Sequence, residues 1–202
     1  MKLQRIVLIL VLGVAAALSV GAATHLGKSL AQWQSGLEST NRTERLLAAR
    51  SIGEMAIAHK PGADKAVFAA LDDADSAVRY WAVVAVGQMG EAARPAEKKL
   101  EALLHDPAQE VRIWAAFALA RLGHAGQGVS ALIKEMSDPN KGARLHAVEA
   151  LDELGTEARA AVPVLKKATT DEFDYVQRIA RHALWVLGER PCPYKVCEGG
   201  SR

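Results

Sequence analysis

The chain has 202 residues, of which 50% are hydrophobic and 24% are charged. This composition supports a substantial buried core and excludes an intrinsically disordered protein. The 25 basic residues are nearly balanced by 23 acidic ones, so we expect no nucleic-acid partner.

Residues 1–23 have the pattern of an export or membrane-targeting segment. Lys2 and Arg5 precede an uncharged run, residues 6–23, which ends in small residues. This order is typical of a cleaved secretory signal peptide. A retained single transmembrane anchor in the inner membrane is the other interpretation, because the run approaches the roughly 20 residues that span a bilayer. Both interpretations predict that the rest of the chain acts outside the cytoplasm, in the periplasm or at the cell surface, with membrane contact only through an uncleaved segment.

Residues 24–37 precede the repeated part of the chain and are interpreted as a linker or a lead-in helix. A weak copy of the repeat follows at Arg45–Ala56, which matches Arg79–Gly90 at an offset of 34 residues. It lacks the aspartate and the final glycine of the later copies. An atypical copy is expected at the end of a repeat array, because one of its faces meets solvent.

A pattern of 32 to 33 residues repeats within residues 38–190. Each of four copies has an aspartate, then an arginine or glutamine six residues later, then a closing glycine. These positions are Asp73, Arg79 and Gly90; Asp106, Arg112 and Gly123; Asp138, Arg144 and Gly155; and Asp171, Gln177 and Gly188. Such a period is typical of a helical solenoid.

Each copy predicts a hairpin of two helices. Counted back from the glycine, the residues at positions 12, 8, 5, 4 and 1 are apolar in every copy, a spacing that marks one face of a helix. In the first copy they are Val78, Ala82, Ala85, Val86 and Met89. The glycine predicts a left-handed C-terminal cap and the aspartate a turn or an N-cap. A shorter apolar pattern before each aspartate predicts the first helix of the hairpin.

Residues 191–202 form a tail that contains both cysteines of the chain, Cys192 and Cys197. In an oxidising compartment, a disulfide that closes this short loop is the favoured interpretation. Half of a metal site is the alternative, but two cysteines without further ligands fall short of the four that a structural zinc ion takes. We therefore expect no metal, and no motif of a cofactor site is present.

The consensus Asp-x4-Val-Arg-x2-Ala-x2-Ala-Leu-x2-Leu-Gly resembles HEAT-like repeats of the kind first grouped with phycobilisome lyases. Two segments, Val78–Ala82 and Val111–Ala116, also resemble HEAT segments appended to some bacterial sulfatases. The resemblance covers residues 38–190 and implies an all-α fold, a right-handed α-solenoid of about five HEAT-like hairpins. Because this repeat class includes lyases, hydroxylases and scaffolds, it implies no single function.

In the resembled family the aspartate and arginine of each repeat are structural and form a ladder of hydrogen bonds and ion pairs. The resemblance therefore implies a structural ladder of Asp73, Arg79, Asp106, Arg112, Asp138, Arg144 and Asp171. Gln177 departs from the pattern at the last rung. An anion site built from stacked arginines is the functional alternative.

The outward positions of the second helices are the main candidates for a binding site. The resemblance places these helices on the concave side, where two middle repeats carry apolar residues and the last two mostly polar ones. We predict a partner-binding surface formed by Tyr80, Val84, Ile113, Phe117, Glu149, His182 and Trp185. The alternative is that tight curvature of the solenoid buries the apolar members between neighbouring repeats.

From these features we predict a non-enzymatic scaffold that holds another protein along its concave side. We expect no catalytic residue, because the sequence has neither the His–Glu pairs of a di-iron hydroxylase nor a nucleophile elbow. The alternative is a lyase-like or enzyme-accessory module that binds a small ligand or substrate in the concave groove. Since chromophore attachment is cytoplasmic in the resembled lyases, export favours the scaffold.

Overall fold

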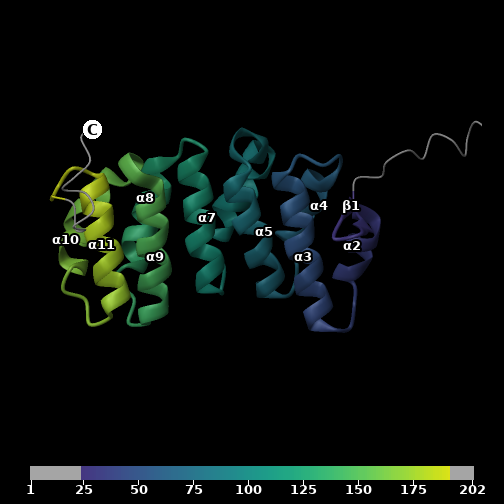
Figure 1. Cartoon of the computed structure of the whole chain (residues 1–202), viewed down its shortest axis with the longest axis horizontal. Helices are drawn as coiled ribbons and strands as arrows, with labels where there is room; N and C mark the ends of the chain where they lie inside the picture. The colour runs from purple at the N-terminus through teal and green to yellow at the C-terminus, as the bar shows by residue number, and fades with distance from the viewer. Residues whose placement is uncertain (1–23, 192–202) are drawn as a thin grey trace, which may run out of the picture.

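A computed structural model describes residues 24–191 and shows a row of stacked helical hairpins (Figure 1). The all-α solenoid predicted from the repeats is confirmed, with a small β-hairpin added at its N-terminal end. The predicted signal or anchor, residues 1–23, and the predicted disulfide between Cys192 and Cys197 lie outside the described residues. Between residues 24 and 191, no helix has both the length and the apolar character needed to cross a bilayer.

Five hairpins follow one another along the described part of the chain. Short 3-10 turns, Gly90–Ala96 and Gly155–Ala161, lead into the first helices of the third and fifth hairpins. The pairs are α2 (Leu30–Leu37) with α3 (Arg42–Ile57), α4 (Ala63–Ala70) with α5 (Ser76–Gln88), α6 (Glu97–Leu103) with α7 (Gln109–Arg121), α8 (Ala125–Glu135) with α9 (Lys141–Leu154), and α10 (Val162–Ala168) with α11 (Asp174–Val186).

The core lies where the repeat pattern predicted it. Every apolar position counted back from the closing glycines is at most 6% exposed, and the alanines among them let neighbouring helices pack closely. The closing glycines all have positive φ, for example 96° at Gly123 and 75° at Gly188, as the predicted caps require, but a ψ of −124° places Gly155 outside the left-handed helical region. Each repeat therefore buries the same helix face against its own first helix.

The middle helix α7 is apolar on nearly all sides because two cores enclose it. Val111 and Leu119 belong to a cluster built with α3 and α5. Ile113 and Phe117 belong to a second cluster that extends through α8 and α9. The apolar character of this helix therefore reflects burial between repeats 2 and 4, which is the alternative that the sequence left open.

The N-terminal end of the array is covered by β1 (Thr24–His25), β2 (Lys28–Ser29) and α2. The two strands are antiparallel, with His25 opposite Lys28. Trp33 of α2 is 3% exposed, and its Nε1–H donates to the carbonyl oxygen of His25 at 3.0 Å. The His25 Nε2 atom lies 2.9 Å from a carboxylate oxygen of Glu54 on α3. Residues 24–37 thus pack as a cap against α3.

The outward face of the last described repeat is polar. Seven residues before the closing glycine, the inner repeats bury Val83, Ala116 and Val148. The equivalent residue of α11 is Arg181, whose guanidinium donates to the carbonyl oxygen of Thr169 and to the Gln177 side chain. The last described repeat therefore lacks, at this position, the buried apolar residue that the inner repeats pack against the next hairpin.

The close approach of α8 to α7 depends on Gly128. A Cβ atom at this position would lie 2.3 Å from the Ala116 carbonyl oxygen and 2.9 Å from the Ala120 Cβ. Gly128→Ala must therefore push two helices apart, and we expect it to lower the free energy of unfolding by about 2 kcal/mol, measured by urea denaturation.

Gly126, two residues earlier on the same helix, is the matched control, since a Cβ there would meet nothing within 4 Å. Gly126→Ala should be neutral or stabilise by up to about 1 kcal/mol, because alanine is the better helix former. Equal effects at the two glycines would contradict the packing argument.

Candidate binding surface on the second helices

The second helices α3, α5, α7, α9 and α11 stand side by side along one side of the array (Figure 1). Tyr80 of α5, Glu110 of α7 and His146 of α9 line one pocket of about 230 Å³ on this side. Because Tyr80 and His146 come from helices two repeats apart, their meeting in one pocket requires the face to curve inward. We call this side the concave face.

The central pocket has a negative electrostatic environment. Burial, followed by the negative charges of Glu149 and Glu110, raises the pKa of Tyr80 above its ordinary value. The Nδ1 atom of His146 lies 3.1 Å from a carboxylate oxygen of Glu149. Glu110 is exposed and forms no ion pair with any residue between 24 and 191. The pocket therefore combines an aromatic ring with unneutralised carboxylate charge.

A second, smaller pocket of about 160 Å³ lies toward the N-terminal end of the concave face. Val84 and Trp81 line it together with Arg50 and Glu54 of α3. The Arg50 guanidinium carbon lies 5.5 Å from the centre of the Trp81 ring, and Nε donates to Glu54 at 2.9 Å. At this end of the surface, a side chain of the protein itself, Arg50, places its positive charge against the Trp81 ring.

A third pocket, of about 290 Å³, lies toward the C-terminal end between α9 and α11. The Nδ1 atom of His182 lies 2.7 Å from one carboxylate oxygen of Asp152, and its ring centre is 5.3 Å from that of Trp185. Tyr175 and Arg178 line the same pocket, with the Arg178 guanidinium 5.7 Å from the Tyr175 ring centre. The polar C-terminal end of the surface, predicted from the sequence, thus consists of side chains that interact with one another.

Two residues predicted for this surface are in the core. Ile113 is 0% and Phe117 is 1% exposed, which corrects the expectation that they contact a partner. A Cβ on Gly87 would lie 3.0 Å from the Phe117 ring, so the missing side chain of the preceding repeat makes room for this ring. Tyr80, Val84, Glu149, His182 and Trp185 are half-buried on the concave face.

The aspartates and arginines of the repeats form a ladder that links one repeat to the next. Arg79 donates from Nη1 to the Asp73 carbonyl oxygen at 2.7 Å, and from Nε and Nη2 to the Asp106 carboxylate at 2.8 and 2.9 Å. Arg144 makes the same contacts to the Asp138 carbonyl and the Asp171 carboxylate. Gln177 keeps the first of these bonds, since its Nε2 donates to the Asp171 carbonyl oxygen at 2.7 Å.

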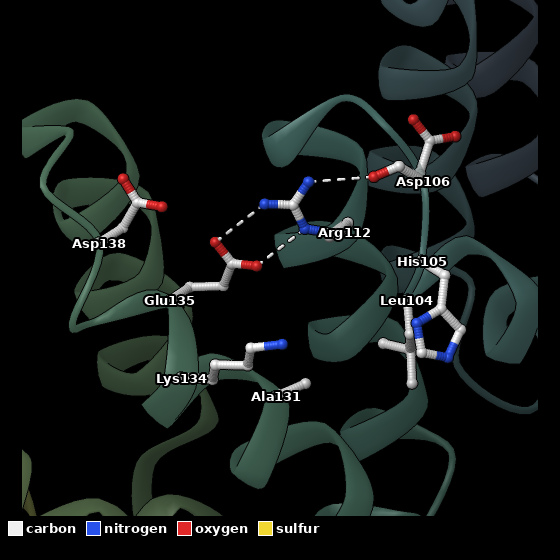
Figure 2. Close-up of a pocket in the computed structure, with 8 residues that line it drawn as sticks. All are labelled: Leu104, His105, Asp106, Arg112, Ala131, Lys134, Glu135 and Asp138. Carbon is white, nitrogen blue, oxygen red and sulfur yellow. Dashed lines mark hydrogen bonds and ion pairs between the residues drawn. The ribbon is translucent and has the colours of Figure 1, made fainter.

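One rung of the ladder is displaced (Figure 2). Arg112 donates to the Asp106 carbonyl oxygen, but its ion pair is with Glu135 at 2.8 Å, and the Asp138 carboxylate points elsewhere. The interval between Asp106 and Asp138 is 32 residues, one shorter than its neighbours, so the register of Asp138 against Arg112 is changed. A cavity of about 400 Å³ opens beside this rung, lined mainly by charged groups that are already paired or exposed.

Asp75 is a ladder residue that the sequence analysis did not include. It caps α5 by accepting from the Ala77 N–H, and it pairs with Arg42 at 3.0 Å and Arg45 at 3.2 Å. The hydrogen bond from Arg42, then that from Ala77, lowers the pKa of Asp75 to about 2. The alignment of Arg45 with Arg79 could have predicted this rung, because it calls for an acidic partner in the next repeat.

The lowered pKa of Asp75 predicts a pH dependence of stability. Its folded pKa lies below the value of 3.8 for an unperturbed aspartate, so its contribution is complete above about pH 4 and is lost as the pH falls through about 2. Because Arg42 is largely exposed, solvent screens the pair and we expect a contribution of about 1 kcal/mol. The difference in unfolding free energy between the native chain and Asp75→Asn should shrink between pH 4 and pH 2. A difference independent of pH would contradict the pairing.

The stacked hairpins, the inter-repeat ladder and the concave face define an α-solenoid. Residues 96–185 match the model of HEAT repeats, and the described residues have the fold of a HEAT-type helical repeat array. No curated protein is similar enough in sequence to match the chain.

Solved structures of repeat proteins are similar to this one. An engineered protein is 26% identical, with a TM-score of 0.57 and coverage of 78% of each chain. The complex of CpcE and CpcF of phycocyanin lyase from Nostoc sp. PCC7120 is 24% identical, with a TM-score of 0.62, covering 86% of this chain and 70% of that one. A designed armadillo repeat protein in complex with peptide (KR)4 is 23% identical, with a TM-score of 0.58 and coverages of 79% and 82%. The last two likenesses concern the fold alone.

Proposed function

We propose that this protein is a non-enzymatic scaffold that binds another protein on its concave face. The observation that carries the proposal is the convergence of Tyr80, Glu110 and His146, from three successive repeats, on one pocket. A face that curves in this way can surround an extended partner segment and contact it from several helices at once. The half-buried rings of Tyr80, Trp81 and Trp185 offer the kind of group that dominates binding energy at protein interfaces.

Two of the similar structures support this use of the fold by analogy. One is a complex of CpcE with CpcF, and another is a complex of a designed armadillo repeat protein with a peptide. We carry the idea of a bound protein segment to this chain as part of the proposal. The alternative, a small ligand in the groove, is less well supported because the concave pockets measure only about 160 to 290 Å³, while ligand pockets are usually roughly 300–1,000 Å³.

A photocrosslinking experiment tests the location of the interface. A photoreactive amino acid is placed at Gln88, an exposed residue beside the Trp81 pocket, or at Glu101, an exposed residue of first helix α6. In cells that make the full chain, we expect one discrete crosslinked protein from Gln88 and none from Glu101. Equal crosslinking from both positions would contradict a concave interface, and a bound chromophore or metabolite in the purified protein would support the small-ligand alternative.

The proposal includes a place of action outside the cytoplasm. It rests on residues 1–23, where two basic residues precede an uncharged run. Sequencing the N-terminus of the mature protein tests this part, since a start near residue 24 would support a cleaved signal. An intact N-terminus on protein recovered from the membrane fraction would support the anchor, and an intact N-terminus on cytosolic protein would contradict export.

A further inference from the structure

The concave face already holds one cation in a defined way. Arg50 lies over the ring of Trp81, 5.5 Å from its centre, and its guanidinium donates to the Glu54 carboxylate at 2.9 Å. The ring attracts the cation through its negative face and the carboxylate supplies the opposite charge. A ring and a carboxylate on adjacent helices therefore make a cation site on this surface, and here α3 fills it.

The central pocket has the same two kinds of group, but no lysine or arginine of residues 24–191 lines it. Its lining includes the Tyr80 ring and the Glu110 carboxylate, and none of the described residues that line it is a lysine or arginine. The residue equivalent to Arg50 is Val84 in the second repeat and the buried Phe117 in the third. The second and third repeats thus have no basic residue at this position.

The charge at the central pocket favours a cation over any other occupant. Glu110 lines the pocket, and after burial the negative charges of Glu149 and Glu110 both act to raise the pKa of the Tyr80 hydroxyl. The Glu149 side chain is 41% exposed and, among residues 24–191, forms an ion pair with His146 alone, while Glu110 forms none there. An anionic ligand would be repelled by both carboxylates, and an apolar ligand would bring no positive charge to neutralise them.

We propose that the pocket between Tyr80, Glu110 and His146 receives an arginine or lysine side chain from an extended segment of the partner protein. This inference rests on the proposed function and specifies the chemistry of the partner. The volume of about 230 Å³ accommodates a guanidinium or ammonium group with part of its stem. Helices α5 and α9 lie two repeat steps apart, roughly 20 Å, so a segment of about six extended residues crosses the site.

The direct test measures binding of a labelled, N-acetylated octapeptide of alternating lysine and arginine to the full chain by fluorescence anisotropy at 0.15 M salt. We expect Glu110→Gln to weaken binding roughly tenfold, since it removes a carboxylate that pairs with the cation. Glu101→Gln is the matched control, because it removes the same charge from an exposed position on α6 and should change binding less than about twofold. Equal loss in both variants would show non-specific attraction and overturn the proposal.

A second variant fills the site from within. His146→Arg brings a permanent cation to a residue that lines the pocket, as Arg50 does for Trp81. We expect it to abolish peptide binding while the circular dichroism spectrum and melting temperature stay close to those of the native chain. Unchanged binding in this variant, or equal affinity of the native chain for a neutral Gln-Ser octapeptide, would overturn the proposal. If the peptide fails to bind while Gln88 still crosslinks a partner, the cation subsite is wrong and the concave interface stands.

Discussion

Replacing Phe117 by alanine is expected to lower the free energy of unfolding by about 3–5 kcal/mol, as measured by urea denaturation. The ring is 1% exposed, packs edge-on against Trp114 at 5.3 Å, and fills the space left by Gly87 of the preceding repeat. Its removal leaves a cavity at the centre of the array, where α7 joins the two core clusters. The array cannot close this cavity without moving a whole repeat, which is why we expect the upper range of such losses.

Tyr175→Ala is the control for the loss of an aromatic ring as such. Tyr175 is 57% exposed, so its truncation should cost less than about 1 kcal/mol. A small loss at Phe117, together with weakened partner binding, would contradict its place in the core and restore it to the binding surface.

Replacing Asp106 by asparagine is expected to cost about 3 kcal/mol of unfolding free energy. Burial acts to raise the pKa of Asp106, but hydrogen bonds from Arg79 and the Ala108 N–H, with the positive charge of Arg79, lower it overall. The two side chains are only 5% and 12% exposed, so the neutral amide leaves the Arg79 charge buried without its counterion. Two carbonyl oxygens still accept from Arg79, which limits the loss.

Asp138→Asn separates the charge effect from the local turn. Asp106 and Asp138 both accept from the backbone N–H two residues later, and asparagine keeps that bond. No arginine or lysine in the described part of the chain pairs with the Asp138 carboxylate, so we expect a change within about 0.5 kcal/mol. Equal losses at Asp106 and Asp138 would mean that the turn, and not the ion pair, stabilises this rung.

The concave face illustrates which site features the sequence could predict. Outward positions of the second helices follow from helical periodicity, which is why Tyr80, Val84 and Glu149 were identified as candidates. Glu110 was missed because it lies one helical turn before Ile113, near the start of α7, and joins the pocket only through the curvature of the array. Asp75 was missed because its basic partners come from an incomplete repeat.

The sequence by itself determined the hairpin repeat, the buried helix faces and the glycine caps, because these depend on interactions within about 33 residues that recur in every copy. Only the tertiary structure decided what each repeat presents to the next. The absence of a side chain at Gly87 makes room for the buried Phe117 ring. The shorter interval between Asp106 and Asp138 leaves Arg112 to pair with Glu135. Inward curvature of the array brings Tyr80 and His146 to one pocket. These contacts depend on the distance and angle between repeats, which are set by side-chain packing and not by the period of the pattern.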